Sequence, residues 1–259
     1  MAKPKVHRTA IVDPDAKLAE GVEIGPYCII GKRVTIGKNS KIHAHVIIED
    51  TDMGSNNSVY PFTSIGLPPQ DLKYNNEKTK VKIGSNNIIR EYVTINKASV
   101  GGDKVTKIGS KNFFMAYVHI AHDCIIGSNV IFANATTLAG HVTVEDSVFI
   151  GGLVAVHQFA RIGASSMIGG FSCIVQDIPP FTTAAGERAK LYGLNSIGLK
   201  RQNFDESTIK NLKRAYKVLF RSKLTRKEAI KKLKNERKET EEINYLIEFI
   251  EQNKRGVCR

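Results

Sequence analysis

The chain has 259 residues, of which 42% are hydrophobic and 24% are charged, so it is long enough to bury a sizeable core and too apolar to be disordered. Its formal net charge of +13 is concentrated in residues 200–238, which hold 15 Lys and Arg against 4 Asp and Glu. Such a basic stretch is either a solvated helix face or a docking surface for an anionic ligand, an acidic protein or a nucleic acid. No nucleic-acid-binding motif accompanies it, so we expect no nucleic-acid partner.

The N-terminal residues do not combine a charged segment with an apolar core, and no stretch approaches the ~20 uninterrupted apolar residues of a membrane span. We therefore expect a cytoplasmic protein without membrane insertion. The cysteines agree with this expectation, because they are scattered without a Cys-x-x-Cys pair. They suit reduced thiols better than a disulfide frame or a zinc site: Cys28, Cys124, Cys173 and Cys258.

Apolar residues recur every six positions through much of the first 189 residues. The spacing begins at Ile24, slips by one residue after Ile48, resumes at Met53 and is unbroken from Ile108 to Ile174. In a chain with 42% hydrophobic residues, twelve successive apolar positions have a chance probability on the order of 10⁻⁵. These twelve are Ile108, Phe114, Ile120, Ile126, Phe132, Leu138, Val144, Ile150, Val156, Ile162, Ile168 and Ile174.

A period of six fits neither an α-helix nor an alternating strand, but it fits a short strand followed by a corner. Three such units make one coil of about 18 residues, and coils stacked ~4.8 Å apart by parallel hydrogen bonding make a parallel β-helix with an apolar interior. We expect this all-β domain to span residues 1–189. Residues 67–82 and 98–107 break the period and should loop out from it.

The pattern becomes helical after Pro179 and Pro180, and we assign residues 190–259 to a small α-helical domain. One helix is expected to begin near Asp205, and Thr225 with Glu228 forms a capping box for the next. Apolar stripes mark the first and last helices: Ile209, Leu212, Tyr216 and Leu219, then Ile243, Leu246, Ile247 and Ile250.

The 18-residue coil brings histidines together at one corner of the β-helix. His122, Gly140 and Gln158 are spaced by 18 residues and therefore occupy equivalent places on successive coils. His141 and His157 adjoin them, and His119 should also face outward because it precedes the inward Ile120. Imidazole titrates near neutral pH, so such a cluster favours general-base chemistry.

Three classes of protein could use this cluster. In an acyl- or acetyltransferase, one imidazole deprotonates a hydroxyl or amine that attacks a thioester, while a backbone N–H such as that of Gly140 holds the oxyanion. A zinc enzyme resembling the gamma-class carbonic anhydrases is disfavoured, because the three-residue spacing of His119 and His122 directs them to opposite sides and Cys124 faces inward. A purely structural prism would leave the two excursions and the basic helical domain unexplained.

Six segments, taken in order, resemble the UDP-N-acetylglucosamine acyltransferases of lipid A biosynthesis across essentially the whole chain: "PPQDLKY", "HIAHDC", "LAGHV", "GGLVAVHQF", "GGFSCIVQDIPP" and "YGLNSIGLKR". The resemblance implies a left-handed β-helix and a homotrimer with active sites between neighbouring chains. It also implies transfer of an R-3-hydroxyacyl chain from acyl carrier protein to the 3-hydroxyl of UDP-N-acetylglucosamine, with neither a metal nor a protein-bound cofactor. The acyl chain length and a 3-amino alternative to the hydroxyl acceptor remain open.

The same resemblance assigns roles to residues. His122 is implied as the general base and Gly140 as the oxyanion donor, while the "QDLKY" loop and the remaining corner residues contact the sugar, phosphates or acyl group: Gln70, Asp71, Lys73, His119, His141, His157 and Gln158. Asn195 and Arg201 match positions at the nucleotide end, where Ile197 and Gln202 depart from the family pattern. Gly170 matches the floor of the acyl groove, and the basic stretch suits an acidic carrier protein.

Overall fold

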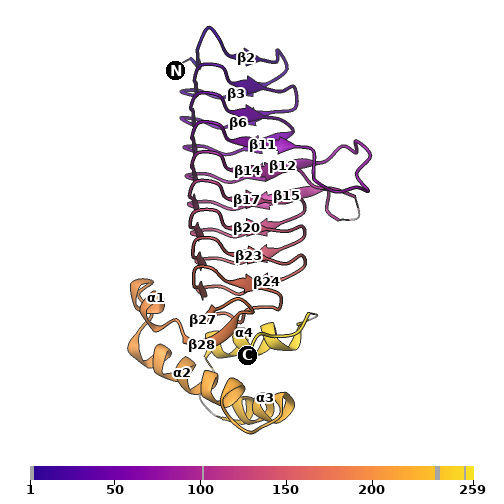
Figure 1. Ribbon diagram of the computed structural model, residues 1–259. Helices are drawn as coiled ribbons and strands as arrows, with labels where there is room; N and C mark the ends of the chain where they lie inside the picture. Colours follow the sequence, from indigo (N-terminus) through magenta and orange to yellow (C-terminus); the bar gives the residue numbers. More distant parts are fainter. Residues whose placement is uncertain (1–2, 101, 237–239, 254) are drawn as a thin grey trace.

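The computed structural model describes residues 3–100, 102–236, 240–253 and 255–259. Figure 1 shows a column of stacked coils that begins at the N-terminus, with a group of helices packed at its far end and a looped excursion from one side. The column is a left-handed parallel β-helix, as expected. Its short strands lie in three parallel sheets, which we call sheets A, B and C.

The strands alternate among the three sheets in chain order. Sheet A contains β1 (Lys5–Val6), β4 (Glu23–Ile24), β7 (Lys41–Ile42), β10 (Ser58–Val59), β13 (Ile88–Ile89), β16 (Phe113–Phe114), β19 (Ile131–Phe132), β22 (Phe149–Ile150), β25 (Met167–Ile168), β27 (Thr182–Ala185) and β28 (Lys190–Leu194). Sheet B contains β2 (Ile11–Val12), β5 (Ile29–Ile30), β8 (Ile47–Ile48), β11 (Ser64–Leu67), β14 (Thr94–Asn96), β17 (His119–Ile120), β20 (Thr137–Leu138), β23 (Ala155–Val156) and β26 (Cys173–Ile174). Sheet C contains β3 (Lys17–Leu18), β6 (Thr35–Ile36), β9 (Thr51–Met53), β12 (Lys80–Ile83), β15 (Val105–Ile108), β18 (Ile125–Ile126), β21 (Thr143–Val144) and β24 (Arg161–Ile162).

The six-residue repeat forms the core of the column. All twelve apolar positions from Ile108 to Ile174 are buried, with at most 4% of each side chain exposed. The strand register confirms the 18-residue coil, because His119 pairs with Thr137 and Thr137 pairs with Ala155. From β1 to β26, residues separated by 18 are therefore vertical neighbours, except across the excursions and across the one-residue slip after Ile48, where paired strands are 17 residues apart.

The chain turns between sheets through corners, most of which place one residue in the left-handed backbone region. These residues also recur every six positions, as in Tyr117, Asp123, Asn129, Ala135 and His141, with φ between 58° and 65°. The turns stack into three edges of the prism, named here the A–B, B–C and C–A edges. The turn after β17 lies on the B–C edge, because it leads from sheet B to sheet C.

Both excursions leave the column at the B–C edge. The first occupies residues 68–79 between β11 and β12, slightly shorter than expected because Lys80 and Lys82 belong to β12. The second lies between β14 and β15, and Gly101 within it is outside the described residues. The amide of Asn96, at the end of β14, donates to the Pro68 carbonyl at 3.0 Å, so the start of the first excursion is held against the strand that leads into the second.

A helical domain covers the C-terminal end of the column (Figure 1). It contains α1 (Ser196–Arg201), α2 (Glu206–Phe220), α3 (Arg226–Asn235) and α4 (Glu241–Glu251), and none of the described helices is long and apolar enough to cross a bilayer. Asp205 caps α2, and the capping box of Thr225 and Glu228 begins α3 as expected. The apolar stripes of α2 and α4 form its core: Ile209, Leu212, Leu219, Ile243, Leu246, Ile247 and Ile250.

The boundary between the two parts differs from the expected one in detail. Residues 190–194 form β28, which pairs antiparallel with β27 and so extends sheet A beyond residue 189. The C-terminal residues also return to the column, since Val257 bridges to Asp177. The helical domain is therefore joined to the β-helix through both of its ends.

Candidate active site

The predicted histidine cluster lies on the B–C edge, next to the excursions. His122, Gly140 and Gln158 occupy the same place in three successive turns, and the N–H of His141 donates to the His122 carbonyl at 3.0 Å. Each side chain is held by a turn whose flanking strands are fixed in the sheets. The structure therefore confirms the vertical stack that the spacing predicts.

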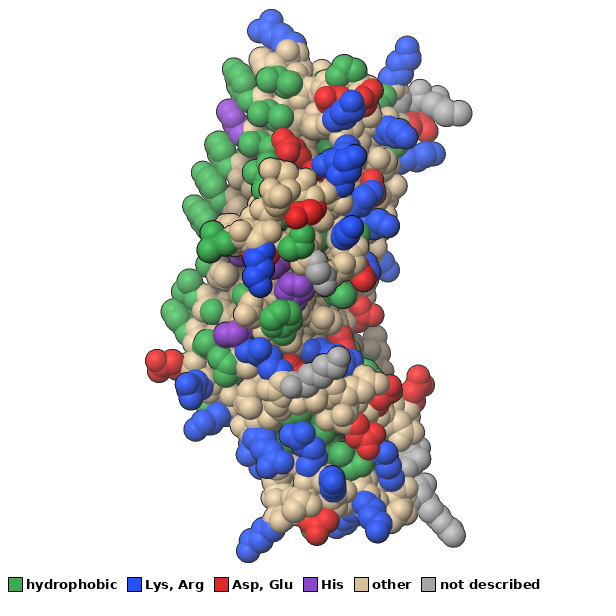
Figure 2. Space-filling view, turned by 90° about the vertical axis from the view of Figure 1, so that its right-hand side faces the viewer, with side chains coloured by type: hydrophobic (Ala, Val, Ile, Leu, Met, Phe, Trp, Pro, Cys, Tyr) green, Lys and Arg blue, Asp and Glu red, His purple; other side chains and the backbone are tan. Residues whose placement is uncertain are grey.

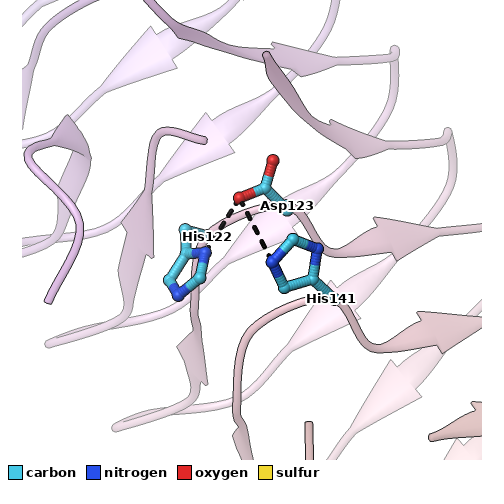
Figure 3. A group of neighbouring side chains, drawn as sticks. All are labelled: His122, Asp123 and His141. Carbon is cyan, nitrogen blue, oxygen red and sulfur yellow. Dashed lines mark hydrogen bonds and ion pairs between the residues drawn. The ribbon is translucent and has the colours of Figure 1, made fainter. Parts of the chain in front are cut away.

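His122 forms a hydrogen-bonded pair with Asp123 (Figure 3). The Nδ1 atom of His122 lies 2.8 Å from Oδ2 of Asp123, and Nε2 of His141 lies 3.9 Å from the same oxygen. An ionised carboxylate can only accept, so Nδ1 of His122 carries the proton and Nε2 keeps its lone pair. This tautomer leaves Nε2 of His122 able to act as a base.

Sequence reasoning missed Asp123, although it directly follows His122. Its carboxyl is almost completely buried, with 4% of the side chain exposed. Burial alone would raise the pKa of Asp123, but the hydrogen bond from His122, the backbone N–H of Ser99 and the nearby His141 together lower it. The carboxylate is thus kept ionised beside the imidazole.

Gly140 lies directly against the His122 ring. A Cβ atom at Gly140 would be 2.6 Å from both Cε1 and Nε2 of His122, which is closer than side chains can approach. The Gly140 N–H donates to no acceptor among the described residues. A backbone N–H without an acceptor, on a residue that lies against an imidazole, is a group that could donate to an oxyanion.

His119 and Cys124 flank this pair in different environments. His119 faces outward from sheet B as expected, and its Nδ1 is 2.7 Å from the hydroxyl of Thr94. Burial, and then the like charge of His122, lower the pKa of His119, so it stays neutral near pH 7. Cys124 faces inward and is fully buried, which raises the pKa of its thiol to about 12 and leaves it unreactive.

The first excursion brings a second carboxylate to this edge. Asp71 accepts a hydrogen bond from the Ser99 hydroxyl at 2.6 Å and another from the backbone N–H of Lys73 at 3.0 Å. The hydrogen bond from Ser99 is the main cause that lowers the pKa of Asp71. Gln70 and Lys73 are exposed on the same loop, so their side chains are free to meet a ligand.

His157 lies one coil below His141 and is exposed, as are its neighbours Gln158 and Phe159. Arg255, near the C-terminus, places Nη2 2.7 Å from Nδ1 of His157 and donates from Nε to the Val175 carbonyl at 3.1 Å. Nδ1 of His157 also lies 3.2 Å from the Gln158 carbonyl. The guanidinium is closer and can only donate, so the contact with Arg255 favours an accepting Nδ1 and a proton on Nε2.

Three predicted site residues lie elsewhere on the same chain. Gly170 belongs to the A–B edge, and its φ is not in the left-handed region, so a strained turn does not explain its glycine. Asn195 and Arg201 line a cavity of about 860 Å³ between α1 and sheet A, with apolar walls from Ile131, Val148, Phe149, Met167, Leu194 and Ile197. One chain alone does not bring these residues to the His122 corner.

The two residues that depart from the family pattern at the nucleotide end, Ile197 and Gln202, both line this cavity. Ile197 is 69% exposed at its wall, and the amide of Gln202 accepts from the Ser165 hydroxyl at 2.6 Å. Asn195 caps α1 by accepting from the Gly198 N–H, and its amide also donates to the Ser165 carbonyl. Arg201 is exposed and has no ion-pair partner among the described residues, so it is available to an anion.

His122, Asp123 and His141 offer three ligand atoms within 4.8 Å of one another, so a metal must be considered. Two ligand atoms of a tetrahedral zinc at ~2.1 Å would be about 3.4 Å apart. Nδ1 of His122 and Oδ2 of Asp123 are instead 2.8 Å apart, which is a hydrogen-bond distance. The geometry fits a shared proton better than a shared ion.

Comparisons with known proteins agree with this geometry. Bacterial hexapeptide-transferase repeats match residues 3–38, 15–50 and 106–140, and the second domain of UDP-N-acetylglucosamine O-acyltransferase matches residues 177–258. The acyl-(acyl-carrier-protein)–UDP-N-acetylglucosamine O-acyltransferase of Thermodesulfovibrio yellowstonii is 62% identical over 98% of this chain and 99% of its own. The chain belongs to the UDP-N-acetylglucosamine O-acyltransferase family.

Solved structures in this O-acyltransferase family share the whole fold. LpxA from Acinetobacter baumannii is 45% identical, with a TM-score of 0.95 over 98% of this chain and 99% of that one. The UDP-N-acetylglucosamine acyltransferase of Arabidopsis is 35% identical, with a TM-score of 0.87 over 98% and 100%. The likeness thus extends from the first coil to the helical domain.

Proposed function

We propose that this enzyme transfers an R-3-hydroxyacyl chain from acyl carrier protein to the 3-hydroxyl of UDP-N-acetylglucosamine, the first step of lipid A biosynthesis. The observation that carries the proposal is the His122–Asp123 pair with the Gly140 N–H beside it. The relatives that cover the whole chain support the same donor and acceptor by their names.

The site would perform the transfer in two proton movements. Nε2 of His122 removes the proton from the 3-hydroxyl as its oxygen attacks the thioester carbonyl, and Asp123 stabilises the resulting imidazolium. The Gly140 N–H donates to the oxyanion of the tetrahedral intermediate. When the C–S bond breaks, the imidazolium returns the proton to the leaving thiolate, so His122 ends in its starting state. The donor is already an activated thioester, and we expect no metal or bound cofactor.

The polarity of the three sheets supports a homotrimer. Outward residues on sheet B carry no Asp, Glu, Lys or Arg, whereas sheet C presents Lys17, Asp52, Lys82, Lys107 and Arg161. The A–B edge carries an exposed ladder of stacked rings with centroids about 5 Å apart: Tyr27, His45, Phe62, Tyr92 and Tyr117. In the upper part of the molecule in Figure 2, hydrophobic side chains line the left margin and charged ones crowd the right. An exposed apolar edge of this length favours burial against another protein chain.

Closed threefold symmetry would bury this edge if the A–B edges of three chains meet at the axis. Sheet B of one chain then faces sheet A of the next, where the outward residues from β13 to β25 are Ile88, Phe113, Ile131, Phe149 and Met167. The cleft between them is bounded by the His122 corner of one chain and by the Arg201 cavity of its neighbour. This arrangement joins the two groups of predicted site residues that a single chain keeps apart.

The remaining assignments follow from the same cleft. Asp71, Lys73 and Gln70 would contact the sugar nucleotide, and the uncharged strip between His122 and Gly170 would hold the acyl chain.

Exposed lysines on one face of α2 suit an acidic carrier protein: Lys210, Lys213 and Lys217. Arg214 is instead half-buried in an ion pair with Glu236 and is less available for docking. A cytoplasmic location suits the four free thiols.

The proposed reaction is tested by incubating the enzyme with UDP-N-acetylglucosamine and a mixture of hydroxyacyl carrier proteins. We expect a mass spectrum with a mono-acylated sugar nucleotide whose ester is cleaved by mild base. Fragmentation should place the acyl group on the 3-oxygen, and the mass gives the preferred chain length. The same acyl groups on coenzyme A test whether the carrier protein is needed. An amide product formed only from a 3-amino sugar nucleotide would contradict the proposal.

A mixed-trimer experiment tests whether the site is shared between chains. His122→Ala and Arg201→Ala chains are each expected to be inactive at low UDP-N-acetylglucosamine. A site in a mixed trimer is restored when an Arg201→Ala chain supplies its native His122 and the neighbouring His122→Ala chain supplies its native Arg201. Random co-assembly should therefore restore about one quarter of the sites. Turnover of co-expressed, co-purified trimers is the measurement, and a mixture of separately assembled trimers is the control. Co-assembled trimers with no recovered turnover would place both residues in one chain's site.

A further inference from the structure

One buried serine connects the two carboxylates of the site. Ser99, in the second excursion, is completely buried. Its hydroxyl donates to Oδ2 of Asp71 at 2.6 Å, and its backbone N–H donates to Oδ2 of Asp123 at 2.9 Å. Asp123 in turn holds His122, so a continuous hydrogen-bonded chain runs from the first excursion to the base.

We propose that Ser99 is a positioning residue that holds the Asp71 carboxylate in register with the His122–Asp123 pair. The inference rests on the proposed function, because it gives Asp71 its role toward the sugar nucleotide. Through Ser99, the loop that binds the acceptor and the turn that deprotonates it share one anchor. The acceptor hydroxyl is then delivered at a fixed distance from Nε2 of His122.

The contacts of the first excursion show why Asp71 needs this anchor. Leu72 beside it is fully exposed, and Lys73 is exposed as well, so apolar burial does not fix this part of the loop. The Asp71 carboxylate is held by one hydrogen bond at each oxygen, from the Lys73 N–H and from the Ser99 hydroxyl. The Lys73 bond is local to the loop, and the bond from Ser99 is what ties the carboxylate to the rest of the site.

The two functions of Ser99 can be separated by mutation. Ser99→Ala removes the hydroxyl but keeps the backbone N–H that supports Asp123, so the His122–Asp123 pair keeps its geometry. Ser99→Thr keeps both donors. A hydrogen bond to a charged group contributes about 1.5–3 kcal/mol in general, which is large enough to change the behaviour of an exposed loop.

The test combines kinetics with hydrogen exchange of the intact enzyme. Ser99→Ala should raise the KM for UDP-N-acetylglucosamine by about tenfold or more, leave kcat within about threefold, and speed amide exchange in residues 70–76. Ser99→Thr should restore both the KM and the exchange rate. Adding Ser99→Ala to Asp71→Ala should raise the KM no further than Asp71→Ala alone.

The two readouts separate this inference from the proposed function. Exchange in residues 70–76 needs no substrate, so faster exchange in Ser99→Ala and its reversal in Ser99→Thr support the anchor even if the acceptor were a different sugar. Unchanged exchange, or equal loss of kcat in both variants, would overturn the inference. Faster exchange with an unchanged KM would also overturn it, since the anchored carboxylate would then position nothing for the acceptor.

Discussion

We expect the replacement of His122 with alanine to lower turnover by at least about 10²-fold, the scale set by the loss of a general base. The imidazole combines a buried carboxylate partner with a neighbouring Gly140 whose N–H has no acceptor among the described residues. Because Nδ1 is occupied by Asp123, Nε2 of His122 would take the acceptor proton in the proposed reaction. Steady-state kcat at saturating UDP-N-acetylglucosamine is the measurement, with thermal unfolding to confirm that the variant is folded.

The control for this prediction is His7→Ala, which removes an exposed histidine from the first coil of the column. Its turnover should equal that of the unmodified enzyme. The double variant His122→Ala, Asp123→Asn should lose little more than His122→Ala alone, because Asp123 acts through the imidazole. A His122→Ala enzyme with near-native turnover would remove His122 from the role of base and leave His141 as the next imidazole to examine.

The repeat made the column and its stacked corner predictable from sequence. A strict period of six fixes which side chains face inward, and the 18-residue coil follows from three such units, so the neighbours of His122 could be named without coordinates. The same logic predicted that Cys124 is buried and that His119 faces outward, as observed. Local periodicity is sufficient wherever each coil contacts only the coils above and below it.

The interactions of the excursions were not predictable, because residues outside the repeat have no periodic register. Ser99 and Asp71 are 28 positions apart and meet only because both loops leave the column at the same edge. The contact between Arg255 and His157 spans 98 positions and depends on how the C-terminus returns to the column. Asp123 was missed for a different reason, since the repeat placed it at a corner and gave no sign that loops would cover it.

Gly140→Ala is expected to reduce turnover about as strongly as His122→Ala, by roughly 10²-fold or more, although it adds only a methyl group. The added Cβ would lie 2.6 Å from Nε2 of His122, so the ring must rotate away from the acceptor or the Gly140 turn must shift its N–H away from the oxyanion. Either movement removes a transition-state contact. The loss should therefore appear in kcat, with little change in the KM for UDP-N-acetylglucosamine.

Gly31→Ala is the matched control, because Gly31 also lies on the B–C edge. The atom nearest its added Cβ would be in the flexible Glu49 side chain, at 3.2 Å, and the backbone atoms of Ile48 and Glu49 lie at ordinary contact distances of 3.5 and 3.6 Å. This variant should keep native turnover, which shows that a methyl group on this edge is not harmful by itself. Combining Gly140→Ala with His122→Ala separates the two causes of the loss. If the methyl group acts by moving the imidazole, it costs nothing further once the ring is gone; if it acts by displacing the N–H donor, turnover falls again. Native turnover in Gly140→Ala alone would exclude both causes and move the oxyanion donor to another backbone N–H of this edge.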